Sequence, residues 1–116
     1  MGAVLTAKER CAPVCDVEGV VRELLVEDGG EDEVAVLLFM LDHDAVLLSA
    51  VQLALGGGRY YASSRVARTV LQSLMERGLV RQLNIKYRRR RITVYTLTDC
   101  GLRVARTLAG ILGVRP

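Results

Sequence analysis

The chain has 116 residues, of which 51% are hydrophobic, 25% charged and 4% aromatic, so it is long enough for one modest core and not for two. This composition argues against a disordered chain and fits a core of Leu, Val and Ala. Residues 1–50 contain three basic and eleven acidic side chains, whereas residues 51–116 contain thirteen basic and two acidic ones. We therefore expect one end of the fold to be cationic and to face a polyanion.

The cysteines Cys11, Cys15 and Cys100 are too few, and odd in number, for a disulfide framework. Ordinary thiols in a reducing cytoplasm are therefore expected. The Cys-x-x-x-Cys spacing departs from the usual zinc spacings, and His43 is the single histidine. His43 lies between two aspartates, where capping or solvation is more common than ligation. We expect no metal, no cofactor and no catalytic residue, and hence no enzyme.

In chain order, residues 1–16 show no period, which predicts a flexible N-terminus before a single domain over residues 17–113. A short helix is expected over Val17–Glu27, because its apolar residues recur at helical spacing. Asp28-Gly29-Gly30 closes it. The acidic run Glu31–Glu33 then suits a helix N-terminus, and the apolar run Val34–Leu41 predicts a deeply buried helix.

Asp42-His43-Asp44 interrupts an apolar run that would otherwise reach Leu55. Three polar residues at the middle of a bilayer would be costly, so two short buried helices, the second over Ala45–Leu55, are preferred to a membrane span. The three glycines Gly56–Gly58 end that second helix. They predict a flexible connection and not a phosphate loop, because no Gly-Lys-Ser/Thr follows and no strand precedes them.

The stretch from Ala62 to Thr98 is the most informative part of the sequence. Ser63 or Ser64 can cap a helix that ends near Arg77, where Gly78 provides a stop. One face of this helix is apolar and carries Ala67, Val70, Leu71, Leu74 and Met75. The opposite face is a polar stripe made of Arg65, Arg68, Thr69 and Gln72, which is free to touch a partner.

Alternating residues from Val80 to Tyr87, and again from Ile92 to Leu97, predict a β-hairpin. Its tip, Arg88–Arg91, lacks the Asn-Gly or Asp-Gly of a tight turn, so a longer, mobile loop is expected. Thr98 then caps a terminal helix. Together these elements predict an α+β, mainly helical fold. It is a winged helix-turn-helix with a three-helix core, a hairpin wing and extra N- and C-terminal helices.

The motif Leu74-x-x-x-Gly78-Leu79-Val80, followed by Tyr95-Thr96-Leu97-Thr98-x-x-Gly101, resembles the winged-helix transcription regulators of the MarR and PadR type. The resemblance covers residues 33–112. It implies that the helix before Gly78 enters the major groove of DNA. It also implies that the hairpin contacts the backbone or the minor groove, and that the terminal helices pair two subunits.

Carried over by position, this resemblance implies a sequence-specific regulator of transcription that binds double-stranded DNA as a homodimer. Its DNA-binding residues would be Ser64, Arg65, Arg68, Thr69, Gln72, Lys86, Arg88, Arg89, Arg90 and Arg91. Four consecutive like charges repel one another, so they make little structural sense without phosphates to neutralise them.

Two alternatives stay open. Ser64–Arg68 with Ile92–Tyr95 also resembles the winged helix of a small-subunit ribosomal protein of archaea and eukaryotes, which would imply RNA binding. The same fold also serves as a protein–protein adaptor, since fold does not fix function. Abundant Arg and a single Asn further suggest a thermophilic source.

Overall fold

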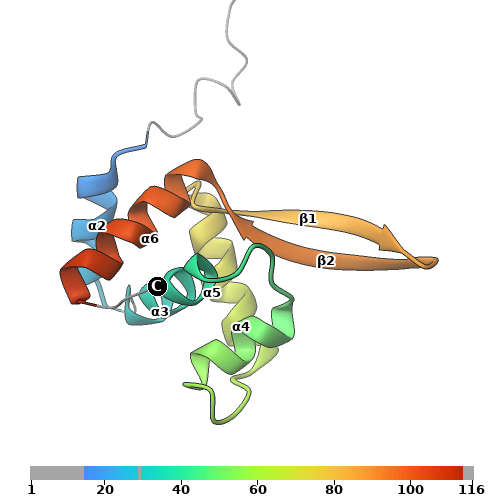
Figure 1. The fold of residues 1–116 in the computed structure, drawn as a ribbon. Coiled ribbons are helices and arrows are strands. Elements are labelled where there is room, and N and C mark those ends of the chain that lie inside the picture. The colour runs from blue at the N-terminus through green and yellow to red at the C-terminus, as the bar shows by residue number, and fades with distance from the viewer. Residues whose placement is uncertain (1–14, 29, 114–116) are drawn as a thin grey trace, which may run out of the picture.

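The computed structural model describes residues 15–28 and 30–113, so residues 1–14 of the predicted flexible N-terminus lie outside the described residues. The fold is α+β, with helices and one antiparallel hairpin (Figure 1). The described elements are α2 (Val17–Val26), α3 (Gly30–Leu41), α4 (Leu48–Leu55), α5 (Ser64–Glu76), β1 (Val80–Tyr87), β2 (Arg90–Leu97) and α6 (Asp99–Leu112).

Helix α3 is the centre of the core, as its apolar sequence predicts. Val36, Leu37 and Met40 are completely buried, and α3 packs against α2, α4, α5 and α6. Asp16 caps the preceding helix α2 by accepting a hydrogen bond from the amide of Gly19. The sequence-based helix over Val17–Glu27 is therefore confirmed almost to the residue.

The predicted helix over Ala45–Leu55 begins later than expected, at Leu48. Val46 instead pairs with Tyr95, and the two residues exchange backbone hydrogen bonds of 2.9 and 2.8 Å. Val46 is buried, and this pairing uses both its amide and its carbonyl group, so the helix begins only after it. Among the described residues, no helix is long and apolar enough to cross a membrane.

Helix α5 matches its prediction in start, end and buried face. The Ser63 hydroxyl accepts a hydrogen bond from the amide of Val66, and the helix ends at Glu76. Gly78 then adopts a φ of 76°, which is the left-handed stop expected of a glycine after a helix. Four of the five predicted apolar residues are buried, and Met75 is partly buried; the buried ones are Ala67, Val70, Leu71 and Leu74.

The expected long loop at the hairpin tip is wrong. Strand pairing continues until Tyr87 meets Arg90, so the turn contains only Arg88 and Arg89. Both have positive φ, 48° and 67°, as a two-residue hairpin turn of the primed type requires. This turn matches the twist of the strands, and here that geometry outweighs the preference of arginine for negative φ.

The start of α6 explains why the Gly-Leu-Val and Thr-x-x-Gly motifs occur together. The Thr98 hydroxyl donates to the carbonyl oxygen of Gly78 at 2.7 Å and accepts from the amide of Gly101 at 3.0 Å. Gly101 lies against the Leu79 carbonyl, and a Cβ at this position would overlap it. The two motifs therefore join the start of β1 to the start of α6.

The prediction of ordinary thiols is wrong for two of the three cysteines. Cys15 and Cys100 form a disulfide, with their Cα atoms 5.5 Å apart. The bond links the residue before the α2 cap to the first turn of α6, and it spans 85 positions of sequence. Neither sequence spacing nor cysteine number indicates that these two helix starts meet in space.

Candidate nucleic-acid interface

The polar stripe of α5 lies on the surface, as predicted. Arg65, Arg68, Thr69 and Gln72 are all exposed, while Ser64, the first helical residue, is partly buried. Two of these side chains already have partners: the Thr69 hydroxyl donates to the carbonyl oxygen of Arg65, and the Gln72 amide donates to Glu76 at 3.3 Å. Both are bonds within one exposed helix, which a ligand can replace at little cost.

A hollow of about 400 Å³ lies between α5 and the hairpin. Its polar lining comes from both elements, Arg68 and Gln72 on α5 and Gln82 and Thr93 on the hairpin. Its apolar part is formed by Leu48, Leu71, Met75 and Tyr95. The fold thus joins part of the predicted helix stripe and one face of the hairpin in a single site.

The hairpin extends well beyond the helical body (Figure 1). All the predicted basic residues near its tip, Lys86 and Arg88–Arg91, are exposed. In the strand register Lys86 is opposite Arg91, and side chains alternate between faces, so this pair shares the face of Gln82 and Thr93. At the turn, the Arg88 guanidinium lies 5.4 Å from the centre of the Tyr87 ring, a cation–π contact.

Arg65 and Thr69 are in a different electrostatic environment from Arg68. With Val66, Val70 and Ser73 they line a second hollow of about 460 Å³, whose other wall is acidic and carries Glu27, Asp28, Asp32 and Glu33. Carboxylates here oppose the approach of a polyanion to this side of α5. The structure therefore divides the predicted stripe between a cationic and an anionic flank.

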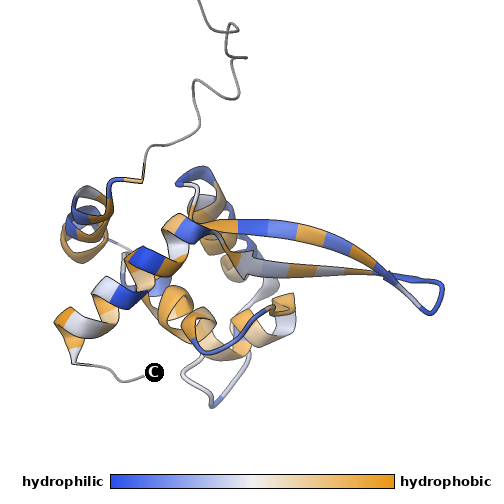
Figure 2. Ribbon diagram, turned by 45° about the horizontal axis from the view of Figure 1, so that its top comes forward, coloured by the Kyte–Doolittle hydropathy of each residue, from blue (hydrophilic) through white to orange (hydrophobic). Residues whose placement is uncertain are grey.

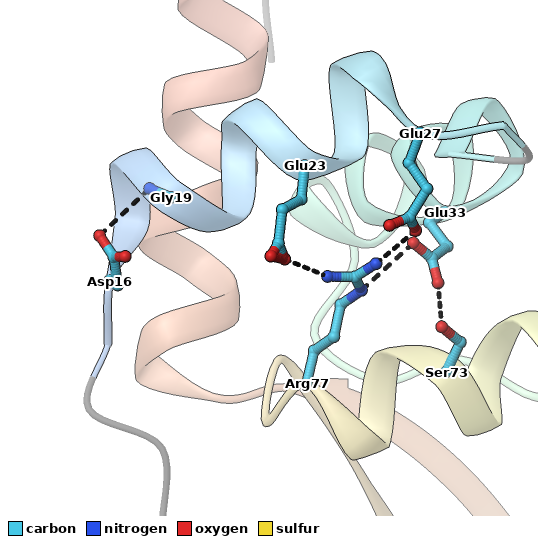
Figure 3. A network of polar contacts seen from close by, with 7 residues as sticks. All are labelled: Asp16, Gly19, Glu23, Glu27, Glu33, Ser73 and Arg77. Atoms are coloured by element: carbon cyan, nitrogen blue, oxygen red, sulfur yellow. Dashed lines mark hydrogen bonds and ion pairs between the residues drawn. The ribbon is translucent and has the colours of Figure 1, made fainter.

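Arg77, directly after α5, fixes the helix to α2 and α3 (Figure 3). Its guanidinium pairs with Glu23 at 3.0 Å, Glu27 at 2.6 Å and Glu33 at 3.4 Å. Glu33, only 6% exposed, also accepts a hydrogen bond from the Ser73 hydroxyl. Burial lowers the pKa of Arg77, but the neighbouring carboxylates outweigh it, and the net pKa is raised above its ordinary value.

The loop before α5 holds surface residues that the sequence prediction did not include. Tyr60 and Tyr61 are 63% and 61% exposed, and Arg59 beside them is exposed too. The loop is held in place because Gln52 and Ala62 exchange two hydrogen bonds of 2.9 Å. Exposed tyrosines beside an arginine are typical of nucleic-acid contacts. The sequence feature that could have identified these residues is the Arg-Tyr-Tyr run directly before a helix with a polar face.

Within residues 15–28 and 30–113, no three His, Cys, Asp or Glu side chains are grouped so as to hold a metal ion. Comparison of the chain with protein-family models, with curated proteins and with solved structures found no match.

Proposed function

We propose that this chain is a winged helix-turn-helix regulator of transcription that binds double-stranded DNA in a sequence-specific way. In this proposal α3, α4 and α5 form the three-helix core, and the β1–β2 hairpin is the wing. Helix α5 lies in the major groove, and wing residues 86–91 contact the backbone or the minor groove. The alternatives are a winged helix that binds RNA and one that binds another protein.

The observation that carries the proposal is the shared surface between α5 and the wing. Arg68, Gln72 and Gln82 line it together, and Lys86 and Arg91 continue the same wing face towards the tip. Arg can bind guanine, and Gln can bind adenine, through two hydrogen bonds each in the major groove. The site thus combines base-reading side chains with cations for phosphates.

The acidic flank sets the direction in which DNA would lie. Asp28 and Asp32 repel phosphates from the Arg65 side of α5, whereas the wing attracts them on the Arg68 side. We therefore place the duplex over Arg68, Gln72 and the wing. Arg59, Tyr60 and Tyr61, just before the α5 N-terminus, supply additional donors for phosphates in this arrangement.

We further propose a homodimer formed through the free ends of α2 and α6. Most of the apolar stripe of each helix packs inside one chain, but Leu25, Val26, Ile111 and Leu112 stay exposed, and a hollow between the helices joins Leu25, Val26 and Ile111. Glu18 and Arg22, both exposed on α2, line the same hollow, so its charges are mixed. A two-fold pairing of α2 with the α6 of a second copy would cover these apolar side chains.

A cytoplasmic location is part of the proposal. The Cys15–Cys100 disulfide is uncommon in the cytosol of mesophiles, but hyperthermophiles have many intracellular disulfides. The bond thus agrees with the thermophilic source expected from the composition.

The test is a salt titration of binding to duplex DNA and duplex RNA by fluorescence anisotropy. Each phosphate neutralised by the protein adds about −0.9 to the slope of log K against log salt. Replacing Arg88–Arg91 with Ala should flatten this slope and weaken binding to all duplexes alike. Replacing Arg68 with Ala should instead reduce sequence discrimination, by roughly 1–3 kcal/mol for the lost guanine contact.

The contrast between the two variants decides the outcome. A wing variant with the affinity and slope of the unmodified protein would rule out DNA binding through the wing and favour the adaptor. Tighter binding to duplex RNA than to any duplex DNA would favour the RNA-binding alternative.

A further inference from the structure

The two faces of the wing differ in chemistry. One face points towards α5 and is polar beyond its base; it carries Gln82, Asn84, Lys86, Arg91 and Thr93. The opposite face carries Leu83, Ile85, Tyr87, Ile92 and Val94, which the strand register places side by side as cross-strand neighbours. We call this apolar face the outer stripe.

The β1 side of the outer stripe is open to solvent, whereas Ile92 is half-buried and Val94 is buried. Leu83, Ile85 and Tyr87 are 40%, 46% and 56% exposed. Figure 2 shows apolar and polar residues alternating along β1, where the hairpin has left the helical body. Single exposed apolar residues are common, but a continuous apolar face usually marks an interaction site. A two-stranded hairpin is also only marginally stable without a layer packed on it.

The two ends of the outer stripe carry opposite charges. At the base, the Thr96 hydroxyl, which lies on the same face, donates to the carbonyl oxygen of Asp44 at 2.8 Å. This bond holds the acidic loop 42–44 beside the stripe, and Asp42 and Asp44 are exposed there. At the tip are Arg88, Arg89 and Arg90. Arg81, which pairs with Thr96, is exposed on the same face, so the base carries the two carboxylates against one arginine. The stripe therefore runs from an end with a net negative charge, across apolar side chains, to a cationic end.

We propose that the outer stripe binds the outer stripe of a second copy of this chain. A two-fold axis through the middle of the stripe lays the two wings antiparallel, face to face. Leu83 and Ile85 then meet their own counterparts, and Arg90 at one tip approaches Asp44 at the other base. A surface with an apolar centre and opposite charges at its ends is self-complementary under such an axis, as a two-fold interface requires.

The apolar centre of this contact, Leu83 and Ile85, is separate from the proposed DNA surface and does not depend on it; only tip residues 87–90 belong to both surfaces. The polar wing face and α5 lie on the other side of the hairpin, so two paired wings present their polar faces in opposite directions. Self-association through the outer stripe would thus leave the α5 side open, and one such pair would hold two duplexes. Failure to bind DNA would leave this proposal intact, and the reverse also holds.

The first test is sedimentation velocity of the full chain without DNA over a concentration series. The double variant L83T/I85T places a β-branched residue, which suits a strand, at both positions but removes the apolar centre. Association through the wing should be at least tenfold weaker in this variant, which then forms only the dimer held by α2 and α6. N84T, on the opposite face of the same strand, is the matched control and should leave association unchanged. Circular dichroism checks that both variants are folded.

The second test locates the axis. With Cys11 replaced by Ser, I85C should form a disulfide-linked dimer on mild oxidation, and N84C should not. R90D and D44R should each weaken association, and the double variant R90D/D44R should restore it. A chain that stays monomeric at 100 micromolar would overturn the proposal. Association unaffected by L83T/I85T would also overturn it, since the dimer would then form elsewhere.

Discussion

At the scale of single residues, the position of α5 depends on the contacts of Arg77. The guanidinium joins carboxylates from α2 and α3, which are distant in sequence from it and adjacent in space. Ion pairs on the surface add little stability. Glu33 is buried, however, and a buried carboxylate without a cationic partner is strongly destabilising. The network therefore holds the base of the proposed DNA-reading helix against the rest of the core.

We expect R77M to lower the free energy of unfolding by about 3 kcal/mol, because it leaves Glu33 buried and unpaired. Urea denaturation followed by circular dichroism measures the change. R81M, on an exposed arginine of β1, is the matched control and should change stability by less than about 0.5 kcal/mol. If the loss comes from the unpaired charge, E33L/R77M should be more stable than R77M alone, and the opposite order would contradict this account.

The turn residues Arg88 and Arg89 place two positive charges at the hairpin tip but lower its stability. A left-handed conformation costs an ordinary L-residue roughly 1–2 kcal/mol, and Asn-Gly is the pair that this turn type favours. We expect R88N/R89G to raise the unfolding free energy by up to about 1 kcal/mol, partly offset by the flexibility of Gly in the unfolded chain. Thermal denaturation measures this, and the same variant should bind duplex DNA more weakly. A loss of stability would show that the arginines make structural contacts of their own.

At the scale of elements, the disulfide encloses all of the helices and strands from α2 to β2 in one covalent loop. Cross-linking residues 85 positions apart restricts the unfolded chain strongly, which the chain-entropy relation values at about 4–5 kcal/mol. The bond also ties α2 to α6, and α2 with its C-cap residue in turn supplies Glu23 and Glu27 to Arg77.

We therefore expect C15S/C100S to unfold at a lower urea concentration, with a loss of about 4–5 kcal/mol, since its unfolded chain regains the freedom of the open loop. C11S is the control and should keep both the disulfide and the stability. Mass spectrometry under non-reducing conditions verifies the bond in each protein. Equal stability of C15S/C100S and the unmodified chain would contradict this account, since it would mean that the bond does not restrict the unfolded chain.

The elements that could be predicted from the sequence are those set by local rules. Ser63 and Thr98 cap α5 and α6 because a hydroxyl three residues before a free amide suffices, and Gly78 stops α5 for an equally local reason. The Val46–Tyr95 pairing and the Cys15–Cys100 bond depend on which distant segments meet, which no period in the sequence encodes.

In the candidate site too, features set by local sequence could be predicted and features set by tertiary packing could not. The exposure of Arg68 and Gln72 follows from helical spacing, so the sequence predicted it. The acidic wall beside Arg65 could not be predicted, because Asp28 and Asp32 belong to the α2–α3 junction and reach α5 only through tertiary packing. The two-residue turn was missed because composition rules disfavour arginine there, while strand register decides the length of the turn.

At the scale of the whole molecule, the two proposed self-contacts lie at opposite ends. The free ends of α2 and α6 are on one side of the helical body, and the wing extends from the other side (Figure 1). Two separate two-fold contacts on one chain do not close into a dimer, since each dimer keeps two unused surfaces. Such a chain continues to add copies and forms larger assemblies.

Light scattering at tens of micromolar should then give a mass above that of a dimer, which rises with concentration. V26K/I111K places like charges at the α2–α6 end and should limit the assembly to a dimer held by the wings. L83T/I85T should limit it to a dimer held by the helices, and the combined variant should be a monomer. If the unmodified chain is a monomer, neither of the two proposed contacts forms. A dimer abolished by only one of the two double variants would identify the single contact that forms and exclude the other.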